Sequence, residues 1–229
     1  RRRRAAARAG CGGAREVLMR YAMRLFIDRL AAGAALALDD AARRVLYVAE
    51  GSVAIGGALS LAADSAWHGG AAALTAGAGG ARLLRFELAA DAAAAPDARL
   101  SAAVTLDPAA PWLIRCDRVA FPPGGVAYTH THQGPGLRCL QLGRIRIETA
   151  GTVHHYAPGE AWFESGPDPV FAAGSETETT AFLRVMVLPR AFLGRSSIRY
   201  VRPEDQDKPK RQSYRIYIDA PLALPGSSP

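Results

Sequence analysis

The chain has 229 residues, enough to bury a large core either as one β domain or as two smaller ones. Its net charge of +7 is concentrated at one end, because residues 1–22 hold seven arginines and one acid, which leaves only +1 for the rest. A basic face for nucleic acid on the body of the protein is therefore not supported, and no run of about 20 apolar residues is present that would span a membrane. We expect residues 1–22 to form a basic, disordered N-terminal extension.

Two further features of the composition bear on where the protein works. The cysteines, Cys11, Cys116 and Cys139, are odd in number and have no metal-type spacing, which argues against a disulfide framework and favours a cytoplasmic protein. The strong preference for arginine over lysine is typical of a GC-rich genome and favours a bacterial source.

Short apolar runs separated by Gly and Asp dominate the chain and predict strands. In chain order they are 25–27, 45–48, 52–55, 83–88, 112–115, 137–142, 144–147 and 182–188. Such spacing is typical of all-β barrels and sandwiches. The alanine-rich segments 31–42 and 89–95 are flanked by Gly, Asp and Pro, which favours loops or strand ends over helices.

The second half of the chain repeats the first. Residues 45–55 align with 137–147 without a gap, 64–67 align with 160–163, and 83–85 align with 182–184. Each half therefore has the same order of strands and turns. The repeat predicts two tandem β-barrels, 23–95 and 108–190, joined by a linker over 89–107.

The tract 191–229 has no counterpart in the repeat and is predicted as a strand extension with a tail. Residues 196–201 and 214–219 are expected as strands, joined by a charged loop over 202–212. An appended strand pair can add to a sheet edge within the chain, or across the interface of a homodimer. The sequence leaves both arrangements open.

A pair of histidines is the clearest candidate for a functional site. His130 and His132 are one residue apart on an extended segment, so their side chains point to the same face of a strand. Two imidazoles on one wall of a barrel form half of a metal site. Glycines and a proline on either side indicate that this strand ends at the mouth of a barrel.

The residues around the histidines resemble the first motif of the cupin superfamily. That motif has Gly, five residues, His-x-His, three or four residues, Glu, six residues and Gly. Gly124, His130, His132 and Gly143 match it, and Gly136 stands where the Glu would be. The resemblance covers about residues 23–190 and implies two cupin-type barrels (double-stranded β-helix, jelly roll), the bicupin form.

The second cupin motif is matched only in part. Pro158, Gly159 and Glu160, followed by Trp162, resemble the turn and strand that precede the motif's His, but that His would fall near Val170. Family metal sites use three His and one Glu on Fe, Mn, Ni or Zn, so two of the four ligands are missing here. The resemblance implies a divalent transition metal bound by His130 and His132.

Other side chains are candidates for completing the site. Gln133 is a candidate metal ligand, and Glu164 is a candidate metal ligand or catalytic general base. Tyr128, two residues before His130, is a candidate substrate-binding hydroxyl. A tyrosine in such a position is more often a core aromatic residue whose hydroxyl reaches solvent.

Arg138 adds a charge to this face. If Gly136 points into the barrel, strand alternation places Arg138, Leu140 and Leu142 inside as well. A buried arginine requires an anionic partner, which is either a bound carboxylate ligand or Glu164. The first alternative makes Arg138 a substrate-binding residue and the second makes it structural.

The first barrel carries no metal motif. The positions equivalent to the two histidines and the Glu are Leu38, Asp40 and Arg44. A guanidinium at that place repels a cation, so we expect no metal there and an Asp40–Arg44 ion pair in its stead.

Two functions follow from these residues. One is a metal-dependent enzyme (oxygenase, isomerase or hydrolase) that acts on a small organic acid at the C-terminal barrel, by analogy with the family. The other is a non-catalytic protein that binds or senses a small anionic molecule and has a degenerate metal site. The sequence leaves open whether the chain is an enzyme.

Overall fold

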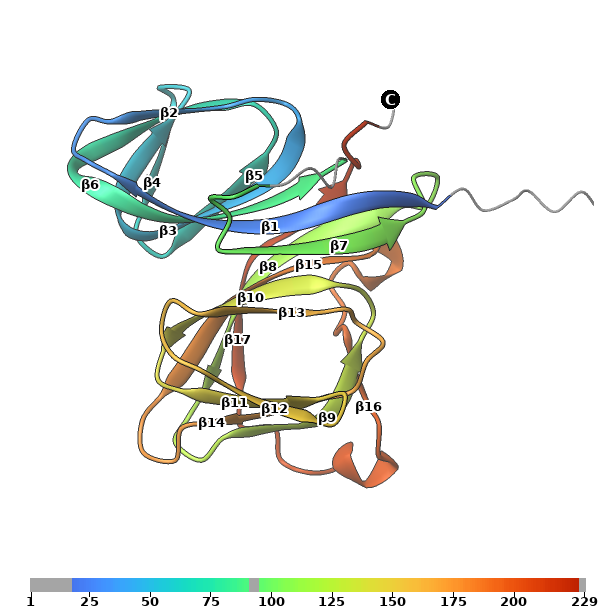
Figure 1. The fold of residues 1–229 in the computed structure, drawn as a ribbon. Helices are drawn as coiled ribbons and strands as arrows, with labels where there is room; N and C mark the ends of the chain where they lie inside the picture. Colours follow the sequence, from blue (N-terminus) through green and yellow to red (C-terminus); the bar gives the residue numbers. More distant parts are fainter. Residues whose placement is uncertain (1–17, 91–94, 227–229) are drawn as a thin grey trace, which may run out of the picture.

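The computed structural model describes residues 18–90 and 95–226, which form an all-β protein of two tandem barrels (Figure 1). This confirms the predicted fold class. The first half consists of β1 (Met19–Leu30), β2 (Ala35–Leu38), β3 (Ala42–Ile55), β4 (Leu59–Ala62), β5 (Ser65–Gly69), β6 (Ala72–Ala89) and β7 (Leu100–Leu106).

The second half consists of β8 (Trp112–Phe121), β9 (Val126–His132), β10 (Gly136–Leu142), β11 (Ile145–Thr149), β12 (Thr152–Tyr156), β13 (Ala161–Glu164), β14 (Val170–Gly174), β15 (Thr180–Pro189), β16 (Ile198–Tyr200) and β17 (Ser213–Leu222). Two short 3-10 helices, η1 (Arg190–Phe192) and η2 (Pro203–Asp205), flank β16. None of the helices in the described part of the chain has the length and apolarity that crossing a membrane requires.

The N-terminal half is one seven-stranded sheet that curls over a core of its own. Its order is β4-β3-β6-β1-β7, with β2 paired to β6 and β5 paired to β3. The long strands β3 and β6 shift register twice, at residues 48–50 and 51–53 of β3, and such bulges bend a strand. Gly51 lies at the second shift with a φ of 74°, and a Cβ there would overlap the carbonyl oxygen of Gly80. This close approach therefore requires a glycine.

The C-terminal half is a barrel of two facing five-stranded sheets. Their orders are β13-β10-β15-β8-β17 and β12-β11-β14-β9-β16. The C-terminal extension supplies one edge strand to each sheet, because β17 pairs with β8 and β16 pairs with β9. Of the two arrangements that the sequence left open, the structure shows pairing within the chain. The apolar part of the barrel interior includes Val119, Phe121, Leu140, Ile147, Trp162 and Phe182.

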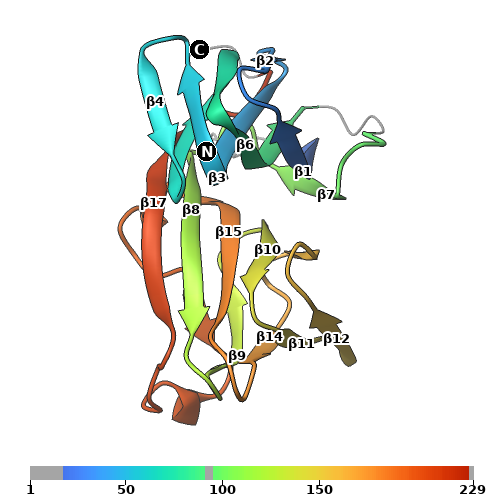
Figure 2. The same ribbon diagram turned by 90° about the vertical axis from the view of Figure 1, so that its left-hand side faces the viewer.

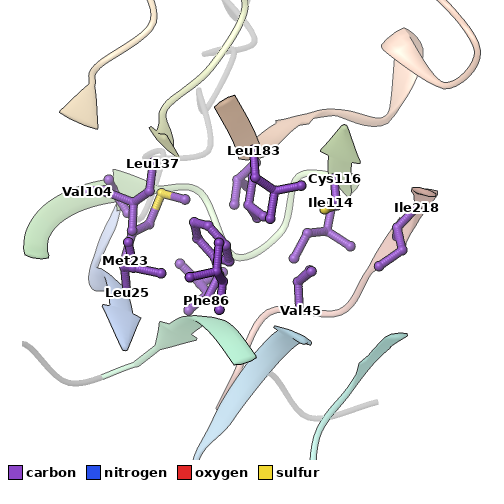
Figure 3. Close-up of a cluster of buried hydrophobic side chains, with 14 of the residues drawn as sticks. Met23, Leu25, Val45, Phe86, Val104, Ile114, Cys116, Leu137, Leu183 and Ile218 are labelled. Atoms are coloured by element: carbon purple, nitrogen blue, oxygen red, sulfur yellow. The ribbon is translucent and has the colours of Figure 1, made fainter. Parts of the chain in front are cut away.

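A second hydrophobic core lies between the two barrels. Figure 2 shows the N-terminal sheet packed across the end of the sheet that holds β8, β15 and β17. In Figure 3, Met23, Leu25, Val45 and Phe86 of the first barrel lie opposite Ile114, Cys116, Leu137, Leu183 and Ile218 of the second. Because alternate residues of β15 face this core and the barrel interior, β15 is buried on both sides.

A polar contact joins the barrels beside this core. Asp64, in the turn before β5, accepts hydrogen bonds from the hydroxyls of Tyr47 (2.8 Å) and Tyr217, and it is paired with Arg118 (3.3 Å) and Arg215. Tyr217 and Arg215 are on β17, so the contact runs from the first barrel to the C-terminal extension.

Three local expectations need correction. The expected linker over 89–107 contains β7, which pairs with β1 and belongs to the N-terminal sheet. Residues 19–22 of the expected disordered extension are part of β1, whereas residues 1–17 lie outside the described residues, as do 91–94 and 227–229. Leu142 is exposed, because a bulge between Leu140 and Leu142 reverses the alternation of β10.

Candidate functional site

The two histidines lie side by side inside the C-terminal barrel. His130 and His132 point inward from the end of β9, and both are at least 95 % buried. Their Nε2 atoms are 3.2 Å apart. The Nδ1 of His130 lies 2.7 Å from the carbonyl oxygen of Tyr128, which fixes the proton on Nδ1 and leaves the Nε2 lone pair facing the barrel interior.

A carboxylate and a guanidinium complete the cluster. Glu164 of β13 lies directly across from Gly136 of β10, and its Oε2 is 3.3 Å from the Nε2 of His132. The same oxygen is 2.7 Å from Nη2 of Arg138. Glu164 Oε1 accepts a hydrogen bond from the indole of Trp162 (2.8 Å). Of the two partners considered for Arg138, the structure shows Glu164.

Gly136 makes room for the guanidinium. Arg138 donates from Nη1 to the Gly136 carbonyl oxygen at 2.6 Å, and a Cβ on Gly136 would lie 2.9 Å from that same nitrogen. The position at which the cupin motif has its metal-binding Glu is therefore occupied by the head of Arg138, and the carboxylate in contact with that head, Glu164, comes from the neighbouring strand.

Burial controls the protonation of this cluster. It lowers the pKa of His132 to about 3, against the opposing hydrogen bond with Glu164, and it also lowers the pKa of His130. Burial raises the pKa of Glu164, but the charge of Arg138 and the hydrogen bonds from His132 and Trp162 outweigh it and hold the pKa well below the ordinary range. Glu164 is therefore a poor general base, because such a carboxylate does not take up a proton near neutral pH.

A second buried ion pair lies next to the cluster. Arg184 of β15 donates to Asp117 of β8 through two parallel hydrogen bonds of 2.9 and 2.7 Å. Both side chains are at least 94 % buried. Arg184 is therefore already neutralised by the protein, as Arg138 is.

The cluster surrounds a small void that adjoins a much larger cavity. The void among His130, His132, Arg138 and Glu164 measures only about 20 Å³, room for a single water molecule or ion. A mouth cavity of about 380 Å³ opens between β16 and β17. Arg184, Ile198 and Tyr214 line both spaces, so the mouth cavity adjoins the cluster.

Four cations and two tyrosines are among the thirteen residues that line the mouth cavity. Arg115, Arg184, Arg195 and Lys210 face it with one carboxylate, Asp117, and the polar side chains include Tyr200, Tyr214 and Gln212. Arg115 is held by Asp219 (3.0 Å) and by two backbone carbonyls. Gln212 is 93 % buried, and its Oε1 has no hydrogen-bond partner in the structure.

Two of the predicted site residues lie outside both spaces. Tyr128 packs beside Lys208, whose Nζ is 4.8 Å from the ring centroid, because a bulge in β9 places Ala127 and His130 inward and turns Tyr128 away. Gln133 follows the end of β9 and does not line either cavity. In the first barrel, Asp40 pairs with Arg43 (2.6 Å) and not with Arg44, which is buried against Glu87 (2.7 Å).

The lining of the mouth cavity was not predicted from the sequence. Arg115 and Asp117 alternate with apolar residues in β8, a pattern that indicates charged groups on one buried face, but their partners Asp219 and Arg184 are distant in the chain. Tyr214 and Gln212 were assigned only to an extension. No local signal shows that this extension closes one side of the barrel.

The residues of the cluster do not fit a divalent metal as they stand. Within residues 18–90 and 95–226, no three His, Cys, Asp or Glu side chains are arranged to hold an ion. Val170 lies opposite His130, where the third His of the cupin motif would be. The carboxylate nearest the histidines is already paired with Arg138, whose permanent charge repels a cation.

Comparison with solved structures identifies the fold. No family model matches the sequence, and no curated protein does. AerE from Microcystis aeruginosa superposes with a TM-score of 0.55 at 12 % identity, covering 72 % of this chain and 88 % of AerE. A mutant of Bacillus subtilis oxalate decarboxylase OxdC, a bicupin, superposes with a TM-score of 0.55 at 12 % identity, covering 75 % of this chain and 72 % of OxdC. The chain has a cupin fold.

This cupin fold confirms the resemblance found in the sequence. At these identities the likeness concerns the cupin fold alone, and the function is argued from the site.

Proposed function

We propose that the C-terminal barrel binds a small organic anion in the mouth cavity and does so without a metal ion. The observation that carries the proposal is the excess of positive charge in the lining: Arg115 and Arg184 are paired with Asp219 and Asp117, whereas Arg195 and Lys210 have no carboxylate partner among the described residues. A volume of about 380 Å³ lies within the range of small-molecule sites.

The polar groups of the cavity suggest what the ligand carries. Arg195 is exposed at the rim and can reorient toward an anion, and Lys210, also exposed, is held there by backbone carbonyls of residues 205–208, whereas Arg115 and Arg184 are fixed by carboxylates. The Oε1 of Gln212 has no partner and is covered by protein, so a small side-chain shift would let it accept a hydrogen bond from a ligand with a hydroxyl or amino group next to its anionic group. A small hydroxy acid or amino acid has both features.

The test is a binding screen of the whole protein in the presence of a chelator. Thermal shift against small hydroxy acids, amino acids and simple carboxylates selects ligands, and calorimetry then gives their affinities. Arg195→Ala should weaken binding about tenfold, the expected effect of losing one charge-assisted hydrogen bond. Arg199→Ala is the matched control, because Arg199 is an exposed arginine of β16 that does not line the cavity.

The outcomes separate local contact from net charge. Equal weakening in Arg195→Ala and Arg199→Ala would assign the effect to overall charge and remove the mouth cavity from the account. Absence of any hit among the three ligand classes would overturn the proposal.

One observation favours a second candidate, a metal-dependent oxygenase, isomerase or hydrolase that acts on a small organic acid. The Nε2 atoms of His130 and His132 are 3.2 Å apart, and both histidines line the same small void, as two ligands of one metal ion would. Oxalate decarboxylase, which shares the fold, is described with Mn(II) centres. Arg138 weighs against this candidate. Less than a tenth of an equivalent of transition metal in untagged protein, unchanged by His130→Ala, would dismiss it.

A further inference from the structure

Two separations between polar atoms of the cluster equal those between ligands of one metal ion, although the cluster is not arranged to hold an ion as it stands. Two ligand atoms bound to one ion at about 2.1 Å lie about 3.0–3.4 Å apart when the angle between the bonds is that of an octahedral or tetrahedral site. The separation between Nε2 of His130 and Nε2 of His132 is 3.2 Å, and that between Nε2 of His132 and Oε2 of Glu164 is 3.3 Å. Two imidazoles and one carboxylate are a ligand set that binds divalent transition metals.

The guanidinium of Arg138 stands in the way of an ion. Its Nη2 lies 2.7 Å from the same Glu164 oxygen that faces His132. The contact between this nitrogen and this oxygen does not have hydrogen-bond geometry, so the two groups are held together by charge. Gly136 supplies the space, since any side chain there would meet the guanidinium.

We propose that the Arg138 guanidinium takes the place and the charge of the metal ion in this barrel, and that its removal opens a two-histidine, one-carboxylate site for a divalent cation formed by His130, His132 and Glu164. An arginine stays charged at any pH at which the protein is folded, so the native chain keeps this site closed. Glu164, across from Gly136, provides the carboxylate that the motif lacks at Gly136 itself.

The proposal predicts that removing the charge of Arg138 allows the protein to bind a divalent cation. In Arg138→Ala the Glu164 carboxylate loses its partner, and a cation between it and the imidazoles is the available replacement. We expect the wild-type protein to take up no Co²⁺ or Zn²⁺ at its histidine pair. The variant should bind one equivalent, at least tenfold more tightly than the wild type.

The experiment is a Co²⁺ titration of the full chain followed by visible absorption, with Zn²⁺ and the melting temperature as a second readout. Metal should raise the melting temperature of Arg138→Ala and leave that of the wild type unchanged. His132→Ala in the Arg138→Ala background should abolish the uptake. Arg44→Ala is the matched control, because it removes a buried guanidinium to which the structure brings the carboxylates Glu87 and Asp39.

Three results would overturn the proposal. They are His132-dependent binding of one equivalent by the wild type, no uptake by folded Arg138→Ala, and equal uptake by Arg44→Ala. If Arg138→Ala does not fold, Arg138→Gln, which keeps a donor for Glu164 without the charge, is titrated in the same way. A folded Arg138→Gln that binds Co²⁺ no better than the wild type would also overturn it.

Discussion

The buried pair of Arg184 and Asp117 permits a quantitative prediction about stability. Asp117→Ala leaves the guanidinium of Arg184 buried without its partner, and removing one member of a buried ion pair costs about 3–5 kcal/mol. The lower end applies here, because Glu164 also acts on Arg184 electrostatically. At about 2–4 °C per kcal/mol for a chain of this size, the melting temperature should fall by about 6–12 °C.

A double variant tests whether the loss of stability comes from leaving one charge buried without its partner. Asp117→Leu with Arg184→Met replaces the two charges by apolar side chains in a largely apolar barrel, and such replacements are often neutral or stabilising. We expect the double variant to be within about 1 kcal/mol of the wild type in urea denaturation, although Asp117→Ala alone is not.

The refuting result is specific. If Asp117→Ala changes the free energy of unfolding by less than about 1 kcal/mol, the pair behaves as a solvated surface ion pair. The barrel interior would then be open to water at this depth, and the closed cluster described above would be wrong.

Two further predictions concern protonation and backbone geometry. The pKa of His132 is lowered to about 3 in the folded state, so the unfolded chain binds more protons than the folded one below pH 6.5, and the free energy of unfolding falls as the pH drops from 7 to 5. Urea denaturation of His132→Gln should show a smaller dependence of this free energy on pH. An unchanged dependence would contradict the burial of a neutral imidazole. Gly51→Ala should lower the free energy of unfolding by several kcal/mol more than Gly33→Ala. Both glycines have positive φ, but only at position 51 would the added Cβ overlap a backbone oxygen. Equal effects in chemical denaturation would contradict the close approach of Gly51 to Gly80.

The sequence predicts the second barrel better than it predicts the contents of that barrel. The repeat and the alternation of apolar residues identify both halves, because strand period and Gly turns are local properties. The inward orientation of His130 and His132 is also local, and it is confirmed. The position of Tyr128 depends on a bulge, and a single extra residue in β9 reverses its direction without a signal in the sequence.

The pairing of charges could not be predicted from the sequence. Arg138 had two candidate partners, and only the register of β10 with β13 decides that Glu164 reaches it. Arg184 and Asp117 are 67 residues apart, and Asp40 pairs with Arg43 because the turn before β3 brings those two together. Side-chain partners are set by tertiary register, which alternation along one strand does not contain.

The core between the barrels has a consequence for how the protein moves. The central strand β15 of the sheet that carries Arg138 and Arg184 is buried on both faces, between the barrel interior and the core against the first barrel, so local opening of this strand also disrupts the contact with the first barrel. The opposite sheet, which carries the histidines, is covered by no second barrel in this chain and is joined to the rest mainly through turns. The barrel thus has one anchored wall and one compliant wall, and a molecule entering between β16 and β17 would be accommodated by the wall that holds the imidazoles.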